Sequence, residues 1–186
     1  MEAQTKRAVK RLGEILLEMG VITRVDLDTA LRRQRINRLS RCPLFSSLPN
    51  ADLATLSKHF TEVSISTGEQ FIKQGEFDPV LYVIAEGRVQ VSCLDKTDKE
   101  IPIAEVGEGE PIVEMGYFSA GVRAASMVAQ EPIHLLRAEY QDLINYFEKA
   151  ESVALVFMQV VNRRRTELEE IKKREQIDPF AKHMRD

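Results

Sequence analysis

Cysteine is scarce in this chain of 186 residues. Only Cys42 and Cys93 occur, far apart and with no histidine beside either of them. Two isolated cysteines provide neither a disulfide framework nor the paired ligands of a zinc site. We therefore interpret both as small apolar side chains in a protein that is kept reduced.

Long hydrophobic runs are also missing. No segment approaches the roughly 18 consecutive apolar residues that a membrane-spanning helix requires. The opening segment MEAQTKRAVKRLGE is charged, but the apolar core of a signal peptide does not follow it. The sequence therefore predicts a cytoplasmic protein with no membrane span.

Residues that could perform catalysis form no recognisable pattern. The histidines, His59, His134 and His183, are scattered, and His134 lies in the strand-like segment PIHLLRA, where a structural histidine is expected. We find no nucleophile–histidine–acid arrangement, no P-loop and no cluster of metal ligands. The prediction is a protein that is not an enzyme and holds no metal.

Charge is unevenly distributed along the chain. Residues 1–41 carry a net charge of +5, residues 42–150 carry −9 and residues 151–186 carry +1. This shift predicts a basic N-terminal arm, an acidic central domain and a C-terminal helix with a tail, divided at those positions. The arginines of the arm could touch nucleic acid or an acidic lipid surface. Contact with the acidic central domain is the more ordinary use, and it is the one we expect.

Two helices are expected in the arm. Apolar residues at helical spacing predict the first over residues 5–20, and Gly20 would end it. Thr23 is the predicted N-cap of the second, with Asp26 in the acidic position three residues later. The buried face of the second helix is expected to consist of Leu27, Ala30 and Leu31.

The central domain begins with a turn and a short helix, and then becomes strand-like. Asn50 is the predicted cap of that helix, whose apolar stripe is Leu53, Leu56 and Phe60. From residue 61 to about 139, short alternating runs of apolar and polar residues are interrupted by glycines. This pattern is typical of antiparallel strands in a sandwich or a barrel.

Helical periodicity returns after residue 139, and residues 150–172 predict one long helix. A heptad-like seam on this helix predicts pairing with a second chain. The members of the seam are Ala150, Ala154, Phe157, Val161, Arg164, Leu168 and Ile171.

The segment EPIVEMGYFSAGVRAASMVA (110–129) places one acid, Glu114, nine residues before one base, Arg123. A guanidinium among small residues has room for two oxygens of a carboxylate or phosphate, and backbone N–H groups near Ala124 and Ala125 are open to the same anion. A nearby carboxylate can accept hydrogen bonds from the hydroxyls of a sugar. The pattern fits a ribose phosphate, and it also fits a plain ion pair across a hairpin.

Residues 43–165 resemble the cyclic nucleotide-binding domain of the family that includes the catabolite activator and the regulatory subunits of protein kinase A. The separation of Glu114 and Arg123 matches the family's phosphate-binding cassette without a gap. The resemblance implies an α+β fold, in which an antiparallel β jelly roll carries an N-terminal two-helix arm and a long C-terminal helix. It rests on PLFSSL (43–48), GEQFIKQG (68–75), LYVIAEGRVQV (81–91), VGEGEPIVE (106–114) and RAASMVA (123–129).

The resemblance also implies a ligand and its contacts. In the family the cassette Glu binds the ribose 2′-hydroxyl and the Arg binds the cyclic phosphate, so these roles fall on Glu114 and Arg123. Alanine after the Arg is usual in cAMP-selective members, so cAMP is the expected ligand and cGMP the less expected one. The implied ligand-binding residues are Val113, Glu114, Met115, Arg123, Ala124 and Ala125.

The chain departs from the family pattern inside the cassette. Val113 replaces a glycine, Ile112 replaces an aromatic residue, and Val122 stands where proline often precedes the Arg. A β-branched valine avoids backbone conformations that glycine adopts. Two hypotheses follow: a non-enzymatic cAMP receptor, or an interaction module whose nucleotide pocket has degenerated.

The arm carries a second, smaller resemblance. Residues 11–34, RLGEILLEMGVITRVDLDTALRRQ, are similar to one half of the N-terminal domain of type II secretion and pilus-assembly ATPases. In several of those proteins two such halves bind cyclic di-GMP, but here Arg11 and Gly13 lack a companion half. A docking helix pair is the expected use, and a cyclic di-GMP effector is a third hypothesis.

The expected partners are a cyclic mononucleotide, a second copy of the chain bound through the C-terminal helix, and a protein that the sequence does not identify. No DNA-reading module is expected after the long helix. In the family, ligand occupancy repositions the C-terminal helices as a lid over the base. We therefore expect the long helix to respond to ligand.

Overall fold

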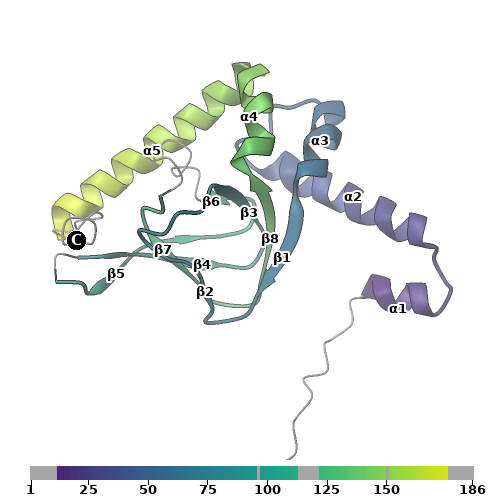
Figure 1. Cartoon of the computed structure of the whole chain (residues 1–186), viewed down its shortest axis with the longest axis horizontal. Coiled ribbons are helices and arrows are strands. Elements are labelled where there is room, and N and C mark those ends of the chain that lie inside the picture. Colours follow the sequence, from purple (N-terminus) through teal and green to yellow (C-terminus); the bar gives the residue numbers. More distant parts are fainter. Residues whose placement is uncertain (1–11, 96, 113–121, 150, 176–186) are drawn as a thin grey trace, which may run out of the picture.

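The computed structural model describes residues 12–95, 97–112, 122–149 and 151–175 (Figure 1). In these ranges two four-stranded antiparallel sheets, with orders β1-β8-β3-β6 and β2-β7-β4-β5, carry helices before and after them. The predicted fold class is confirmed. The strands are β1 (Thr61–Ile65), β2 (Gln70–Ile72), β3 (Val80–Glu86), β4 (Val89–Leu94), β5 (Glu100–Val106), β6 (Pro111–Ile112), β7 (Ser126–Ala129) and β8 (Ile133–Glu139).

The helices lie in two groups around the sheets. In Figure 1, α2, α3 and α4 lie beside β1 and β8, whereas α5 runs from α4 toward β5. The helices are α1 (Leu12–Glu18), α2 (Arg24–Arg41), α3 (Asn50–Leu56), the short 3-10 helix η1 (Ser57–His59), α4 (Tyr140–Lys149) and α5 (Glu151–Glu175).

Strand β3 is buried on both faces. Tyr82 and Ile84 point into the core between the two sheets. The residues that alternate with them along the strand are Leu81 and Val83. These point into a second core beneath the helices. Because successive side chains of a strand face opposite ways, a strand with two buried faces is apolar throughout. This explains why the segment VLYVIA shows no polar alternation.

The second core joins the first sheet to helices from both ends of the chain. It contains Leu39 of α2, Leu53 and Leu56 of α3, Leu143 of α4 and Phe157 of α5. The apolar stripe predicted for α3 is confirmed, since its members are buried. The helix itself begins at Asn50 with Pro49 at the N-cap, so the predicted cap is wrong by one residue.

Helix α2 begins as predicted. Thr23 accepts a hydrogen bond from the Asp26 N–H at 3.2 Å, and the Asp26 carboxylate accepts one from the Thr23 N–H at 2.9 Å. This capping box satisfies two N–H groups that a helix start leaves unpaired. The hydrogen bonds from Thr23 hold the pKa of Asp26 below its usual range.

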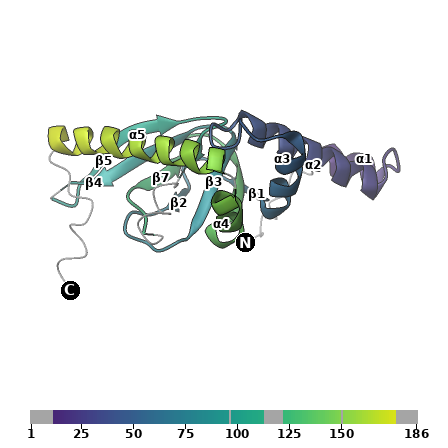
Figure 2. The same ribbon diagram turned by 90° about the horizontal axis from the view of Figure 1, so that it is seen from above.

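The buried face predicted for α2 is wrong. Ala30 is exposed, Leu27 and Leu31 are half-buried, and only Leu39, near the other end of the helix, is fully buried. Figure 2 shows the reason: α1 and the first turns of α2 project to one side of the sheets. Apolar residues there can contact only the other helix of the pair. A group of them is therefore exposed, namely Leu12, Ile15, Met19, Val21 and Val25.

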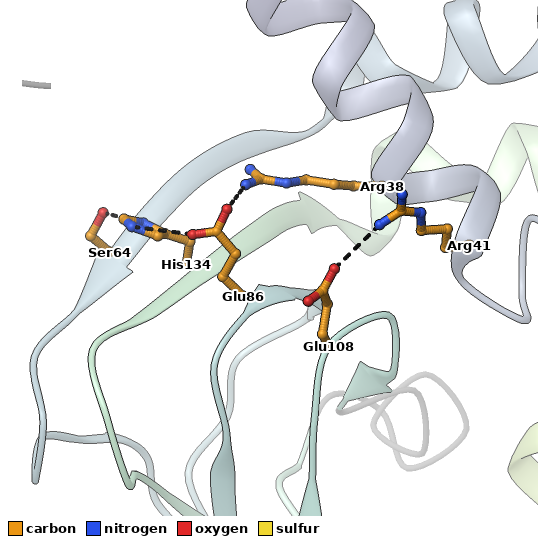
Figure 3. A network of polar contacts seen from close by, with 6 residues as sticks. All are labelled: Arg38, Arg41, Ser64, Glu86, Glu108 and His134. Carbon is orange, nitrogen blue, oxygen red and sulfur yellow. Dashed lines mark hydrogen bonds and ion pairs between the residues drawn. The ribbon is translucent and has the colours of Figure 1, made fainter. Parts of the chain in front are cut away.

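Three of the six arginines of α2 face the acidic domain, which is the contact we expected. They stand three positions apart and pair with acids from three different segments of the domain, and Figure 3 shows the second and third of these pairs. The pairs are Arg35 with Glu62 at 3.5 Å, Arg38 with Glu86, and Arg41 with Glu108 at 3.4 Å.

Glu86 also links the arm to β8. Its second carboxylate oxygen lies 3.9 Å from His134 Nε2, and His134 Nδ1 lies 2.9 Å from the Ser64 hydroxyl (Figure 3). His134 therefore has the structural setting expected for it.

The apolar seam of α5 is used within the chain. Phe157, Val161 and Leu168 are buried against the chain's own domain. The seam therefore does not provide the surface for a second chain, whereas Leu155 and Met158 on the same helix are exposed. A homodimer through α5 stays a prediction, and it would use this other face.

The turn between β3 and β4 gives a prediction for stability. Gly87 has φ +94°, and a Cβ there would lie 2.6 Å from Ile133 Cγ2. Gly68 has φ +77°, but a Cβ there would meet nothing within 4 Å. We expect Gly68→Ala to lower the free energy of unfolding by about 1–2 kcal/mol through backbone strain alone. We expect Gly87→Ala to lower it by about 1–3 kcal/mol more because of overpacking. Urea unfolding of both variants measures the difference, and equal losses would contradict the predicted clash.

Candidate functional site

A cavity of about 300 Å³ lies between the second sheet and α5. Its size is at the lower end of the range for small-molecule sites. The sheet contributes an apolar wall made of Val91, Ile103 and Met127. Helix α5 contributes the facing apolar residues, Leu168 and Ile171. Charged residues form part of the same lining: Glu105, Glu110, Arg163, Arg164 and Glu167. The cavity therefore combines apolar surface with a few charged groups, as ligand sites do.

The structure brings together part of the predicted ligand-binding set. Ala124 and Ala125 line the cavity, and Arg123 directly precedes them with only 2% of its surface exposed. Val113, Glu114 and Met115 lie outside the described residues. The assignment of all six as ligand contacts stays a prediction.

Two chain segments running side by side hold Arg123. Its backbone N–H donates to the Glu76 carbonyl at 2.9 Å, and its own carbonyl accepts from the Gly75 N–H at 2.9 Å. Phe77 and Val122 form an isolated antiparallel bridge beside these bonds. The loop before β3 and the segment before β7 thus fix the backbone from which the guanidinium extends.

The guanidinium of Arg123 has two hydrogen-bond partners, and its Nε has none among the described residues. One Nη donates to the Asp78 carboxylate at 2.6 Å, and the other donates to the Val80 carbonyl at 3.1 Å. Its Nε is buried and has no hydrogen-bond partner among the described residues. Buried donors are normally satisfied, so this Nε is available to an acceptor, and Arg123 differs from Arg35, which has the same feature, by its position next to the cavity-lining Ala124.

Asp78 is the residue of this candidate site that the sequence analysis missed. Its side chain is 36% exposed, and it supplies the counter-charge for a guanidinium that is almost fully buried. The sequence feature that could have identified Asp78 is its position, two residues before the most apolar strand of the chain. Such a signal is weak, because surface acids precede many strands.

Tyr82 remains neutral beside this ion pair. Burial, together with the nearby carboxylate of Asp78, raises the pKa of the Tyr82 hydroxyl above its usual value. The Tyr82 hydroxyl also contacts the guanidinium of Arg137, which pairs with Glu139 at 2.6 Å. An anionic group would be attracted by the guanidinium of Arg123 and would compete with the carboxylate of Asp78.

Helix α5 closes the cavity on the side opposite the sheet. Leu168 is buried in a small cluster with Cys93, against which Ala124 and Ala125 also pack. Arg164 of α5 approaches Glu110 to 3.6 Å. The residues following Arg123 are therefore in contact with the helix that covers the cavity.

The described residues contain neither a candidate metal site nor a candidate membrane-spanning helix. No group of three His, Cys, Asp or Glu side chains in these ranges could hold a metal ion. None of the described helices combines the length and the apolar composition of a membrane span.

Comparison with known proteins relates the sheet-forming part of the chain to one family. The model of the family described as "Cyclic nucleotide-binding domain" matches residues 62–150. The type II regulatory subunit of cAMP-dependent protein kinase from Drosophila melanogaster is 32% identical over 115 residues, which is 61% of this chain but 30% of that protein. The chain thus spans less than a third of that relative.

Solved structures show the same similarity. The N-terminal domain of a transcriptional regulator from Streptomyces coelicolor A3(2) is 30% identical, with a TM-score of 0.57, and the match covers 71% of this chain and 94% of that one. The catabolite activator protein of Thermus thermophilus is 26% identical, with a TM-score of 0.64, over 72% of this chain and 63% of that one.

The buried ion pair gives a prediction for stability and anion binding. Asp78→Ala leaves a buried guanidinium without its counter-charge, so we expect it to lower the free energy of unfolding by about 3 kcal/mol. Arg123→Met should cost about 1 kcal/mol or less, because the exposed part of Asp78 can be solvated. Urea unfolding compares the two variants.

Added inorganic phosphate distinguishes an anion site from a purely structural pair. It should raise the melting temperature of Asp78→Ala and leave that of Arg123→Met unchanged, since only the first retains a buried cation without a counter-charge. An equal phosphate response in both variants would show that Arg123 does not bind the anion.

Proposed function

The chain belongs to the cyclic nucleotide-binding domain family, and from this premise we propose that it is a non-enzymatic receptor for a cyclic mononucleotide, preferably cAMP. The cyclic phosphate binds Arg123 and the backbone N–H groups that follow it. The ribose 2′-hydroxyl binds Glu114, and the base extends toward the cavity beneath α5.

The observation that carries this proposal is the state of Arg123. A fully buried guanidinium is costly unless it is paired, and here its Nε donor lacks a partner in the described part of the chain. A phosphate oxygen is the kind of acceptor that matches such a donor. The neighbouring alanines lie on the cavity wall, so a ligand held by Arg123 has space to extend.

The preference for cAMP rests on Ala124 and on the nature of the relatives. Ala124 lines the cavity and has no hydroxyl that could meet a guanine. The Drosophila relative is a regulatory subunit of a cAMP-dependent kinase. Both observations favour an adenine nucleotide.

Signalling proceeds through α5. Ligand that binds between the sheet and this helix changes the balance between positions of the helix, because it contacts the helix in only some of them. The exposed residues Leu155 and Met158 are the apolar surface that α5 offers to a second copy or to a partner protein.

A degenerate pocket is the second candidate, and one observation favours it. Asp78 and Val80 each already accept a hydrogen bond from one Nη group of Arg123, so a phosphate has to fit beside these partners or displace them. Val113 in place of the family's glycine points the same way. In that case the domain serves only as an interaction module.

Calorimetry with cAMP and cGMP decides between these candidates. We expect cAMP to bind with a Kd near 1 µM, about −8 kcal/mol. Arg123→Lys keeps the charge but loses the planar fork, so it should weaken binding about tenfold to a hundredfold.

The matched control is Arg35→Lys. Arg35 also has a buried, unpartnered Nε and a carboxylate partner, but it lies against Ser57 and Glu62, away from the cavity. The control variant should bind cAMP like the parent. Absence of heat with both nucleotides, together with an unshifted melting temperature at high ligand concentration, would establish the interaction module instead.

Base selectivity is tested at Ala124. Ala124→Thr adds a hydroxyl on the cavity wall, and one neutral hydrogen bond to guanine should improve cGMP binding about threefold to tenfold relative to cAMP. The ratio of the two dissociation constants measures the effect. An unchanged ratio would show that the base does not approach residue 124.

A further inference from the structure

The turn formed by residues 107–110 is anchored to the middle of β3. Gly109, with φ +85°, donates its N–H to the Ile84 carbonyl at 2.8 Å, and the Ile84 N–H donates to the Glu110 carbonyl at 3.0 Å. The Glu110 carboxylate accepts a further hydrogen bond from the Gly107 N–H at 2.8 Å. Because β3 is buried on both faces, the turn has a rigid support.

The two carboxylates of this turn contact different helices. Glu108 lies 3.4 Å from Arg41 at the end of α2 (Figure 3). Glu110 lies 3.6 Å from Arg164 of α5, whose side chain is 16% exposed and lines the cavity. One short turn therefore joins the arm to the helix that covers the cavity.

The same two helices are also joined through the apolar cores. Phe157, Val160 and Val161 of α5 share a core with Leu39 of α2. Further along α5, Leu168 packs beside Ala124 and Ala125. Since α5 is one continuous helix, a displacement at the cavity is transmitted to the core that holds α2.

We propose that the turn at residues 107–110 couples occupancy of the cavity to the docking of the arm helix α2. Glu110 is a positioning residue, which holds α5 over the cavity through Arg164. Glu108 passes the change to α2 through Arg41. This inference rests on the proposed ligand site and adds its output: the position of the N-terminal arm.

The size of the effect follows from the contacts. Arg41 and Glu108 are mostly exposed, with side-chain exposures of 70% and 56%, so their pair contributes modestly and is screened by salt. We therefore expect a coupling of about twofold to fivefold at low ionic strength. By reciprocity, loosening the arm changes the affinity of the cavity by the same factor.

Amide hydrogen exchange of residues 36–42 in the full chain measures this coupling. Saturating cAMP should change the exchange rate of this segment about twofold to fivefold in the parent. Glu108→Gln and Glu110→Gln should reduce the response, because only the contact through the apolar core then remains, while calorimetry still detects cAMP binding. Glu105→Gln is the control. Glu105 also lines the cavity, but it pairs with Arg88, which directly precedes β4 in the same sheet.

A second experiment needs no nucleotide. Arg164→Gln should change exchange at residues 36–42 about twofold, because it breaks the pair of Arg164 with Glu110 of the turn. The change should disappear when Glu110→Gln is already present, since the two substitutions break the same link.

The outcomes separate this inference from the proposed function. Absence of cAMP binding would contradict the proposed receptor function. The exchange experiment with Arg164→Gln, which needs no nucleotide, then tests the proposed coupling by itself. If cAMP binds and residues 36–42 do not respond, or if both glutamine variants respond like the parent, the turn is not the coupling element. An unchanged exchange rate in Arg164→Gln also overturns it.

Discussion

Burial of β3 on both faces is the constraint on which the remaining features depend. One face of the strand completes the core between the sheets, and the other completes the core beneath the helices. Its backbone also fixes the site, since the Val80 carbonyl accepts from Arg123 and Ile84 anchors the turn at residues 107–110. A strand packed on both faces cannot shift without disturbing two cores. The guanidinium and the turn are therefore placed relative to a common rigid element.

The balance between Arg123 and its partners determines what the cavity can do. A guanidinium buried to this degree requires compensation, and Asp78 supplies it from a position that is about a third exposed. If the carboxylate were fully buried, separating the pair would leave two uncompensated charges in the protein interior, at a large cost. Asp78 can be solvated as it moves, so an incoming anion can replace it at Arg123 with a smaller cost. The pair is therefore compatible with a ligand site, and the exposure of its acid is the reason.

Local features of this structure could be predicted from the sequence, whereas features that depend on distant contacts could not. The Thr23 cap and the stripe of α3 require only neighbouring residues, and the alternation of the strands requires only a buried and an exposed face. The role of Asp78 depends on a contact with Arg123 across 45 positions, which no local pattern contains. The heptad pattern of α5 correctly marks apolar residues, but it cannot tell whether the covering surface belongs to the same chain or to another. The predicted buried face of α2 was wrong for a related reason. Helical spacing identifies an apolar stripe on the helix, but the domain covers only about half of the length of that stripe.

Charge along α2 favours docking of the arm on the acidic domain. Arg35, Arg38 and Arg41 are engaged by the acidic domain, and Arg24 lies 3.5 Å from Asp28 within the helix. Four of the six arginines of α2 are thus paired with acids of the same chain. These pairs are individually weak, and Leu39 is the only fully buried residue of the helix. An arm held by several weak contacts, one of them to a turn that also contacts α5, can change its docking when the cavity changes by a small free energy. The exposed apolar residues of α1 and early α2 would move with it, so a modest event at Arg123 can be expressed at a surface far from the cavity.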